Sequence, residues 1–122
     1  MDTISNYIHG STSKHSSDNY KAVFNPSTGE QISEVVLSDI EDFTNTIKSS
    51  IKAYEQWSEF TPLKRSRILS KYKVLIEKNI ENLAKTISLE HGKTLDDAKG
   101  SVIRGLEVIE FAEGIPHLLK GE

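Results

Sequence analysis

The sequence contains no cysteine among its 122 residues. This absence excludes a disulfide-bonded scaffold, a thiolate zinc site and a cysteine nucleophile within the chain. No long hydrophobic run occurs either, because charged residues interrupt every candidate well before the roughly 20 apolar residues that a membrane span needs. The net charge of −3 at pH 7 is unlike that of a general nucleic-acid binder, which needs positive charge to bind phosphate. We therefore expect neither a membrane nor a nucleic acid as a partner.

Targeting and metal-binding patterns are also absent from the sequence. The first residues lack the basic and apolar regions of a signal peptide and the arginine-rich composition of a mitochondrial transit peptide, so we expect a cytoplasmic protein. The histidines are scattered, and no two have the spacing of metal ligands, so we expect no metal site. They are His9, His15, His91 and His117.

The first third of the chain has the alternating pattern of strands. Segments 21–24 and 31–36 flank a turn in which Pro26 suits the second position and Gly29 can supply a positive φ. This pattern predicts a β-hairpin within about residues 4–37. A short strand-like run precedes it at 6–10, and the polar segment 11–19 is expected to be an exposed loop.

After residue 37 the apolar residues recur with the helical period of 3.6. Ser38 with Glu41 forms a capping-box pattern, Thr61 followed by Pro62 begins a second helix, and Gly114 ends a third. The predicted helices cover about residues 39–58, 62–91 and 95–113. Together with the hairpin they predict an α+β chain whose second helix is long.

The length of the second predicted helix is informative. A straight helix over 62–91 would be about 45 Å long, whereas a globule of this chain length is only about 36 Å across. Either this helix is bent, or the chain is part of something larger. The apolar faces of three helices also exceed what one hairpin can cover, so we expect exposed apolar surface that favours self-association or a partner.

Three local patterns suggest ligand sites, and each has a simpler structural interpretation. Gly92-Lys93-Thr94 resembles the end of a phosphate loop, but Ile87 stands where a glycine is needed, which favours a helix cap instead. Gly100 and Gly105 have the spacing of a nucleotide loop, yet they lie inside a predicted helix. A stripe of small residues there allows either close helix packing or room for a ligand. The stripe consists of Ala98, Gly105 and Ala112.

Five basic residues lie in the first part of the second predicted helix, where cations oppose the helix dipole. A phosphate-bearing ligand or an acidic partner would explain them, although a solvated helix face is the simpler interpretation. They are Lys64, Arg65, Arg67, Lys71 and Lys73.

Three short motifs in this order resemble the N-terminal region of the aldehyde dehydrogenase superfamily. They are FNPSTGE at 24–30, AYEQWS at 53–58 and EHGKT at 90–94. The segments 98–112 and 114–122 narrow the resemblance to the methylmalonate-semialdehyde dehydrogenase branch, whose members are CoA-acylating and also use malonate semialdehyde. The resemblance covers nearly the whole chain, but only the first part of a full family member.

The resemblance implies that residues 1–122 are the N-terminal segment of a cofactor-binding domain, which is α/β and Rossmann-like in the intact family. The intact enzyme would use NAD, CoA and a cysteine thiolate. We expect no catalytic, cofactor-binding or metal-binding residue within this chain, and no cofactor on the chain alone. The remainder of the enzyme would be its partner.

One family role falls inside the chain. Arg104 matches the arginine that the family uses to recognise the substrate carboxylate, and a guanidinium suits a carboxylate because its planar fork can donate two hydrogen bonds. The alternative is a surface arginine paired with Glu107 or Asp97. For the chain as a whole, the alternatives are a truncated non-catalytic module for protein interaction or oligomer assembly, and an unrelated helical interaction domain.

The absence of cysteine generates a first prediction. The chain alone should not reduce NAD with malonate or methylmalonate semialdehyde, with or without CoA, because it lacks the nucleophile. NADH formation followed by absorbance checks this, and turnover above background in a contaminant-free sample would contradict it.

Overall fold

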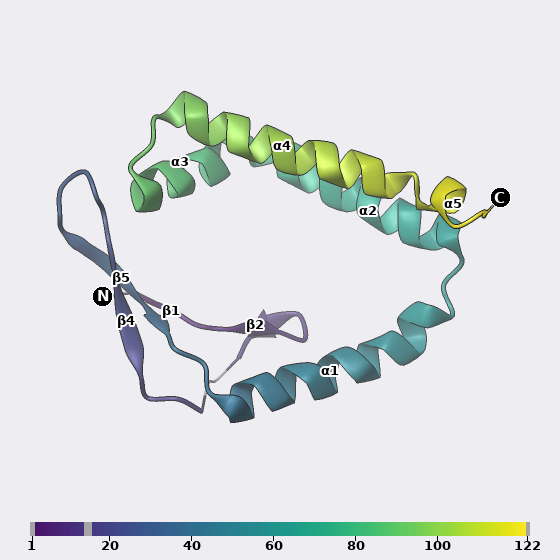
Figure 1. Cartoon of the computed structure of the whole chain (residues 1–122), viewed down its shortest axis with the longest axis horizontal. Coiled ribbons are helices and arrows are strands. Elements are labelled where there is room, and N and C mark those ends of the chain that lie inside the picture. The colour runs from purple at the N-terminus through teal and green to yellow at the C-terminus, as the bar shows by residue number, and fades with distance from the viewer. Residues whose placement is uncertain (1, 14–15, 122) are drawn as a thin grey trace. The chain divides into compact units, whose positions relative to one another are not determined.

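The computed structural model describes residues 2–13 and 16–121 (Figure 1). The chain divides into two compact units, Met1–Glu59 and Phe60–Glu122. Strands and one helix form the first unit, and four helices form the second. This order, strands and then helices, confirms the fold class expected from the sequence.

A three-stranded sheet, ordered β1-β5-β4, is the centre of the first unit. The predicted hairpin is present: β4 (Tyr20–Phe24) pairs antiparallel with β5 (Gln31–Val36). Its turn has Gly29 at φ 74°, and the Asn25 N–H donates to the Glu30 carbonyl over 2.9 Å. β1 (Asp2–Ile4) adds a parallel edge strand to β5, which the local sequence pattern did not reveal.

A small two-stranded ribbon follows β1. It consists of β2 (Tyr7–Ile8) and β3 (Ser11–Thr12), so part of the segment expected to be an exposed loop is paired. His9 and Gly10 turn the ribbon with φ values of 56° and 78°, and positive φ at both central residues suits a tight hairpin. Residues 14 and 15, within the predicted loop, lie outside the described residues.

α1 (Ile40–Ser58) begins one residue later than the capping pattern predicted. Asp39, not Ser38, is the N-cap: its Oδ1 accepts from the N–H groups of Glu41 and Asp42, while its own N–H donates to the Asp42 carboxylate. Ser38 is engaged elsewhere, because its hydroxyl and the Asn6 amide bond each other at 2.9 and 3.1 Å. The capping box is therefore Asp39 with Asp42.

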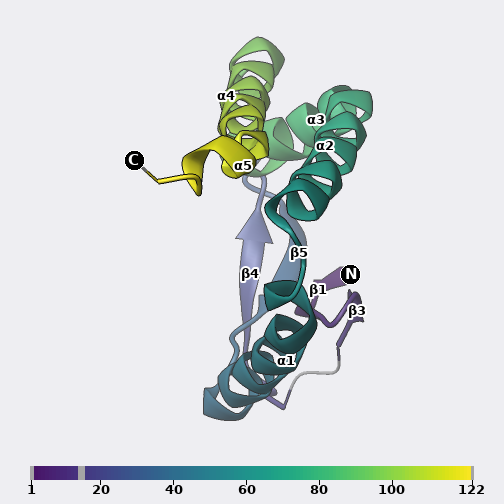
Figure 2. The same ribbon diagram turned by 90° about the vertical axis from the view of Figure 1, so that its right-hand side faces the viewer.

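The second unit is a helical bundle of α2 (Pro62–Lys78), α3 (Ile80–His91), α4 (Leu95–Glu113) and the short α5 (Ile115–Leu118). α4 runs antiparallel to α2 and packs against both α2 and α3 (Figures 1 and 2). The buried apolar side chains are small or medium in size, which lets the helices approach closely. They are Ala84, Ala98, Val102 and Leu106.

The expectation of one helix over 62–91 needs correction, because Asn79 divides this segment into α2 and α3. Asn79 has φ −114° and ψ 11°, and its side-chain amide donates to the Leu75 carbonyl over 2.7 Å. Its N–H bonds the Ile76 carbonyl three residues back, as in a tight turn. Asparagine competes for backbone partners in this way and so ends helices.

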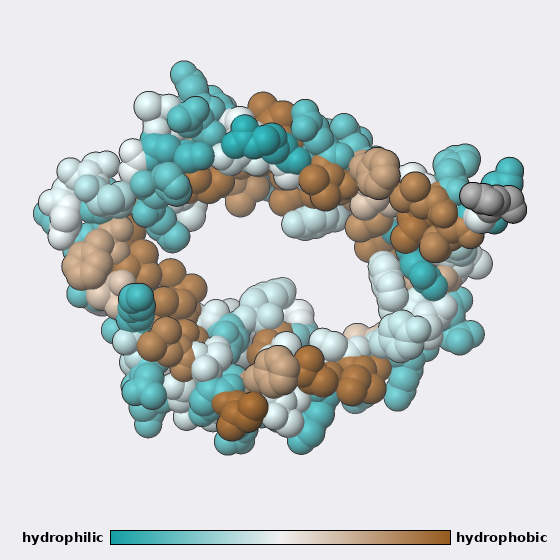
Figure 3. Space-filling view, in the orientation of Figure 1, coloured by the Kyte–Doolittle hydropathy of each residue, from teal (hydrophilic) through white to brown (hydrophobic). Residues whose placement is uncertain are grey.

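The sequence-based expectation of exposed apolar surface is confirmed. α1 carries an apolar stripe whose members are 38–77% exposed, and hydrophobic residues are visible along this helix in Figure 3. The stripe consists of Ile40, Phe43, Ile47, Ile51, Tyr54 and Trp57. Within α2, Tyr72 and Leu75 are 50% and 58% exposed. Large contiguous apolar faces are unusual on the surface of a monomeric protein.

The Asp39 cap generates a prediction about pH. The hydrogen bond from the Asp42 N–H, and then that from the Ser16 hydroxyl, hold the pKa of Asp39 below its ordinary value of 3.8. A carboxyl whose pKa is lower in the folded state contributes stability above pH 3.8 and loses it as the pH falls through the folded-state pKa. The helix signal in circular dichroism should therefore decline through this acid range.

Asp39→Asn should flatten this acid-dependent part of the signal, because asparagine caps helices well but does not titrate there. Asp18→Asn is the matched control, since Asp18 is exposed and takes no part in the α1 cap of the described chain. An acid profile that Asp39→Asn leaves unchanged would contradict the assignment of the cap.

Candidate functional site

Arg104 lies on the exposed surface of α4, in its middle turns. Its Nη2 donates to the Ser101 hydroxyl over 3.1 Å. Within the part of the chain that the structure describes, Arg104 forms no ion pair with Asp97 or Glu107, the two partners that the structural alternative requires. The Arg104 guanidinium is thus oriented through Nη2, and its other N–H donors can bind a ligand.

A second cation reaches the same hydroxyl. Lys93 Nζ donates to Ser101 Oγ over 2.9 Å, and the Ser101 hydroxyl donates a hydrogen bond to the Asp97 carbonyl over 3.2 Å. A hydroxyl has one donor and two acceptor positions, so both acceptor positions are occupied by cations. We call Lys93, Ser101 and Arg104 the Ser101 cluster.

The turn between α3 and α4 places Lys93 in this cluster. Gly92 ends α3 at φ 79°, and its N–H donates to the Ser88 carbonyl over 2.8 Å. The Ser88 hydroxyl then donates to the Lys93 carbonyl over 2.7 Å, and Thr94 caps α4 by accepting from the Asp97 N–H. The interpretation of Gly92-Lys93-Thr94 as a helix cap followed by the next N-cap is therefore confirmed.

The glycines of α4 leave space beside Arg104. Beyond its chain neighbours and the backbone of its own helix, a Cβ added at Gly105 would meet no heavy atom within 4 Å, and one added at Gly100 would meet only the Arg104 Nη1, at 3.7 Å. Ala98, in contrast, is completely buried. Within this unit, close packing therefore explains Ala98 but not Gly105, and the space beside Arg104 is open.

Internal contacts account for several of the basic residues of α2. Lys73 lies 3.4 Å from both Glu110 and Glu113, and the Lys64 ammonium lies 3.5 Å from the centre of the Phe60 ring. Desolvation lowers the pKa of Lys73, but hydrogen bonds and charge from the two glutamates outweigh it and hold the pKa above its ordinary value of 10.5. The Lys73 contacts bind α2 to α4, the Lys64 contact joins α2 to Phe60 just before it, and neither indicates a phosphate ligand.

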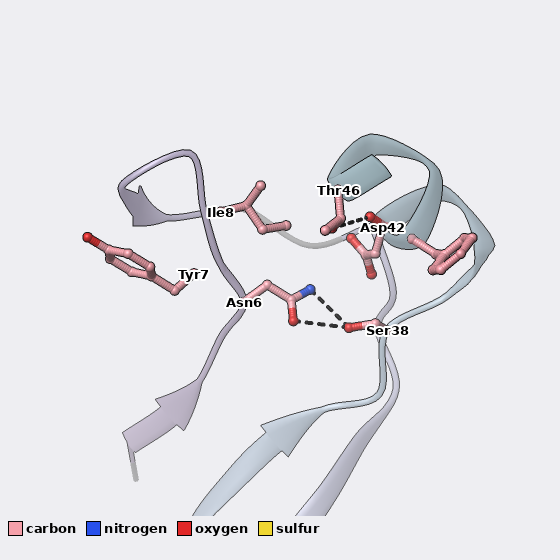
Figure 4. A pocket seen from close by; sticks show the side chains of 7 residues that line it. Asn6, Tyr7, Ile8, Ser38, Asp42 and Thr46 are labelled. Atoms are coloured by element: carbon pink, nitrogen blue, oxygen red, sulfur yellow. Dashed lines mark hydrogen bonds between the residues drawn. The ribbon is translucent and has the colours of Figure 1, made fainter. Parts of the chain in front are cut away.

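The first unit has a pocket of about 320 Å³ between the β1–β2 segment and the start of α1 (Figure 4). Its polar groups bond each other: Asn6 with Ser38, and the Thr46 hydroxyl with the Asp42 carbonyl over 2.8 Å. The buried Asp42 carboxylate also accepts from the Ser16 N–H over 3.0 Å. Each polar side chain that lines the pocket therefore has a hydrogen-bond partner within the described chain, and none of these contacts indicates a ligand.

Two further sequence expectations concern metals and membranes. No three potential metal-ligating side chains come together among residues 2–13 and 16–121, and His15 lies outside that set. No helix in the described chain has the length and apolarity to cross a membrane.

Comparison with known proteins identifies the family. The model of the aldehyde dehydrogenase family matches residues 12–122. The chain belongs to the aldehyde dehydrogenase family. It is 42% identical over 119 residues to malonate-semialdehyde dehydrogenase 2 of Bacillus cereus, and 43% identical to malonate-semialdehyde dehydrogenase 2 of Oceanobacillus iheyensis. Both alignments cover 98% of this chain but 24% of the relative.

Solved structures agree with this assignment. A Sinorhizobium meliloti structure assigned to the methylmalonate-semialdehyde dehydrogenases, complexed with NAD, superposes with a TM-score of 0.97 at 40% identity. The enzyme DddC of Oceanimonas doudoroffii, also a methylmalonate-semialdehyde dehydrogenase, gives 0.88 at 36%. Each comparison covers all of this chain and 25% of the other. The aldehyde dehydrogenase chain thus spans about a quarter of the relatives it matches.

The resemblance to the family singled out Arg104, but neither the resemblance nor the sequence patterns identified Lys93 and Ser101 as its neighbours. The spacing of three residues between Ser101 and Arg104 could have indicated their contact, because such residues lie on one helix face. Nothing in the local pattern could have placed Lys93, whose position depends on the backbone turn at Gly92.

The open space at Gly105 generates a prediction. Gly105→Ala should raise the free energy of unfolding of the chain by about 1 kcal/mol, because alanine is the better helix former and meets no neighbour. Thermal or urea unfolding measures this. Gly29→Ala is the control and should destabilise by about 1 kcal/mol or more, because its φ is 74°. A loss of stability in Gly105→Ala would contradict the open geometry.

Proposed function

We propose that this chain is the N-terminal portion of an NAD-dependent, CoA-acylating malonate- or methylmalonate-semialdehyde dehydrogenase, in which Arg104 binds the substrate carboxylate. The observation that carries the proposal is the exposed Arg104 guanidinium, which Ser101 holds while no acidic side chain of the described chain pairs with it. The identities of about 40% to semialdehyde dehydrogenases support the substrate class.

The chemistry of the substrate explains why an arginine is needed. A semialdehyde of this class has an aldehyde that reacts and a remote carboxylate that does not. A guanidinium is charged at every working pH and donates two parallel hydrogen bonds to a carboxylate. Arg104 would thus orient the substrate and select it over simple aldehydes, without taking part in bond making.

The described residues do not fit a role in holding the cofactors. Among residues 2–13 and 16–121, no glycine-rich loop joins a strand to a helix in the way that nucleotide phosphates require. In the reaction NAD would accept a hydride and CoA the acyl group. The contribution of this chain is to bind and position the carboxylate.

The second candidate function is a non-catalytic module that docks on other protein surfaces or on itself. The apolar stripe on α1 favours it, since its side chains are largely exposed. The same stripe is equally suited to the remainder of the enzyme, as expected for a chain that spans a quarter of its relatives. Co-expression of this chain with the matching C-terminal three quarters of a relative distinguishes the two candidates. Semialdehyde dehydrogenase activity of the combined chains supports the enzyme function.

Arg104 can be tested in a chimera in which residues 1–122 replace the matching segment of the Bacillus cereus relative. Arg104→Leu should lower kcat/KM for malonate semialdehyde by roughly 10- to 150-fold, the range for a lost hydrogen bond to a charged group. Propanal has no carboxylate, so its kcat/KM should change little. Arg104→Lys should recover part of the loss, because an ammonium keeps the charge but not the fork.

Glu107→Gln is the matched control, because it alters a charge one turn away on the same helix. It should leave the ratio of the two kcat/KM values unchanged. Equal losses for malonate semialdehyde and propanal in Arg104→Leu would show a structural role and overturn the proposal.

A further inference from the structure

We propose that Lys93 is a second cation of the carboxylate site, and that Ser101 positions it and Arg104 around one ligand carboxylate. This inference rests on the proposed function of Arg104. It starts from the juxtaposition in the Ser101 cluster: Lys93 Nζ and Arg104 Nη2 lie 2.9 and 3.1 Å from the same oxygen. Their separation cannot exceed the sum of these two distances.

The charge balance around Lys93 is unlike that of the other half-buried lysines in this unit. Lys73 has two glutamates at 3.4 Å, and Lys99 has Glu81 at 2.7 Å. In the described part of the chain, Lys93 and Arg104 have only a neutral hydroxyl between them. Two like charges held this close repel each other. An anion that contacts both would remove the repulsion.

The N–H donors of Lys93 and Arg104 that Ser101 does not use determine which chemical group the site can bind. An ammonium has three N–H donors and a guanidinium has five, and the Ser101 contacts use one of each. Because Ser101 is saturated by its three hydrogen bonds, it orients the cations and has nothing left to offer the ligand. A planar carboxylate can accept from the Arg104 fork and from Lys93 at once.

A carboxylate fits this place better than a phosphate does. Phosphate sites in proteins usually add backbone N–H groups from a loop or a helix N-terminus. Ser101 and Arg104 lie inside α4, where the backbone N–H groups bond carbonyls of the preceding turn. Only side-chain donors therefore face the ligand.

The backbone around Lys93 does not depend on its ammonium. The turn is held by Gly92 at φ 79° and by the Ser88 hydroxyl, which donates to the Lys93 carbonyl. Lys93→Met keeps the aliphatic stem, so the variant should fold as the parent does. Lys85→Met is the matched control, because it removes the same charge from an exposed position of α3.

The first test titrates the 122-residue chain with malonate and follows the Ser101 amide and the Arg104 side-chain Nε–H by NMR. Both signals should shift, and Lys93→Met should weaken the apparent affinity roughly 3- to 10-fold, because the site is partly solvent-exposed. Lys85→Met should change it little. Phosphate is the comparison anion and should shift the same signals less. No shift with malonate, equal loss in both lysine variants, or a larger response to phosphate would each overturn the inference.

The second test is a double-mutant cycle in the chimera with malonate semialdehyde and propanal. Lys93→Met should lower kcat/KM about 10-fold for malonate semialdehyde only. The double variant with Arg104→Leu should lose less than the product of the two single losses, because both cations bind one carboxylate. Ser101→Ala, which keeps both charges, should show a smaller loss of the same selectivity.

The outcomes separate the two proposals. A selective loss in Arg104→Leu with none in Lys93→Met refutes the second cation and leaves the role of Arg104 standing. Losses that multiply independently also refute the shared carboxylate. The absence of a selective loss in Arg104→Leu refutes the proposed role of Arg104 in binding the carboxylate, and the inference fails with it.

Discussion

The turn between α3 and α4 is the constraint on which the second unit depends. Gly92 adopts a left-handed backbone that other residues rarely adopt, and the chain reverses within three residues. The reversal brings the completely buried Ala84 and Ala98 into the helix-packed core. It also places Lys93 beside the second turn of α4. One backbone conformation therefore determines both the packing of the helices and the position of a charged side chain.

The distribution of apolar side chains explains how such a chain relates to a larger enzyme. The buried apolar residues of the described chain are few and mostly small, whereas isoleucines and aromatic residues on α1 are exposed. Burial of apolar area is the main driving force for folding. The exposed stripe on α1 therefore leaves apolar area that contributes little to the stability of this chain alone. This agrees with a chain that spans about a quarter of its relatives.

The sequence predicts elements well where one residue decides the backbone. Gly29 and Gly92 mark a hairpin turn and a helix end because positive φ suits glycine. The sequence predicts the elements less well where two adjacent residues are both suited to the same position. Ser38 and Asp39 are both residue types that cap helix N-termini well. Asp39 is the N-cap of α1, because Asn6, 32 residues away, binds the Ser38 hydroxyl. The break at Asn79 lies in an unbroken apolar pattern, so periodicity alone could not reveal it.

The candidate site, too, has one residue that the sequence identifies and neighbours that only the fold reveals. Arg104 is visible in the sequence through its resemblance to a family motif, but its environment depends on contacts between separate elements. The open space at Gly105 and the shared Ser101 hydroxyl follow from helix geometry, and Lys93 follows from the turn. A site whose residues come from two separate elements is therefore identified from the fold and not from the spacing of residues in the sequence.

The most direct test of the central claim is a crystal structure of a complete enzyme containing this chain, grown with malonate. The claim predicts a carboxylate bound by both nitrogens of the Arg104 fork at about 2.7–2.9 Å, the usual length for a charge-assisted hydrogen bond. Malonate bound elsewhere, with Arg104 paired to Glu107 or Asp97, would contradict it.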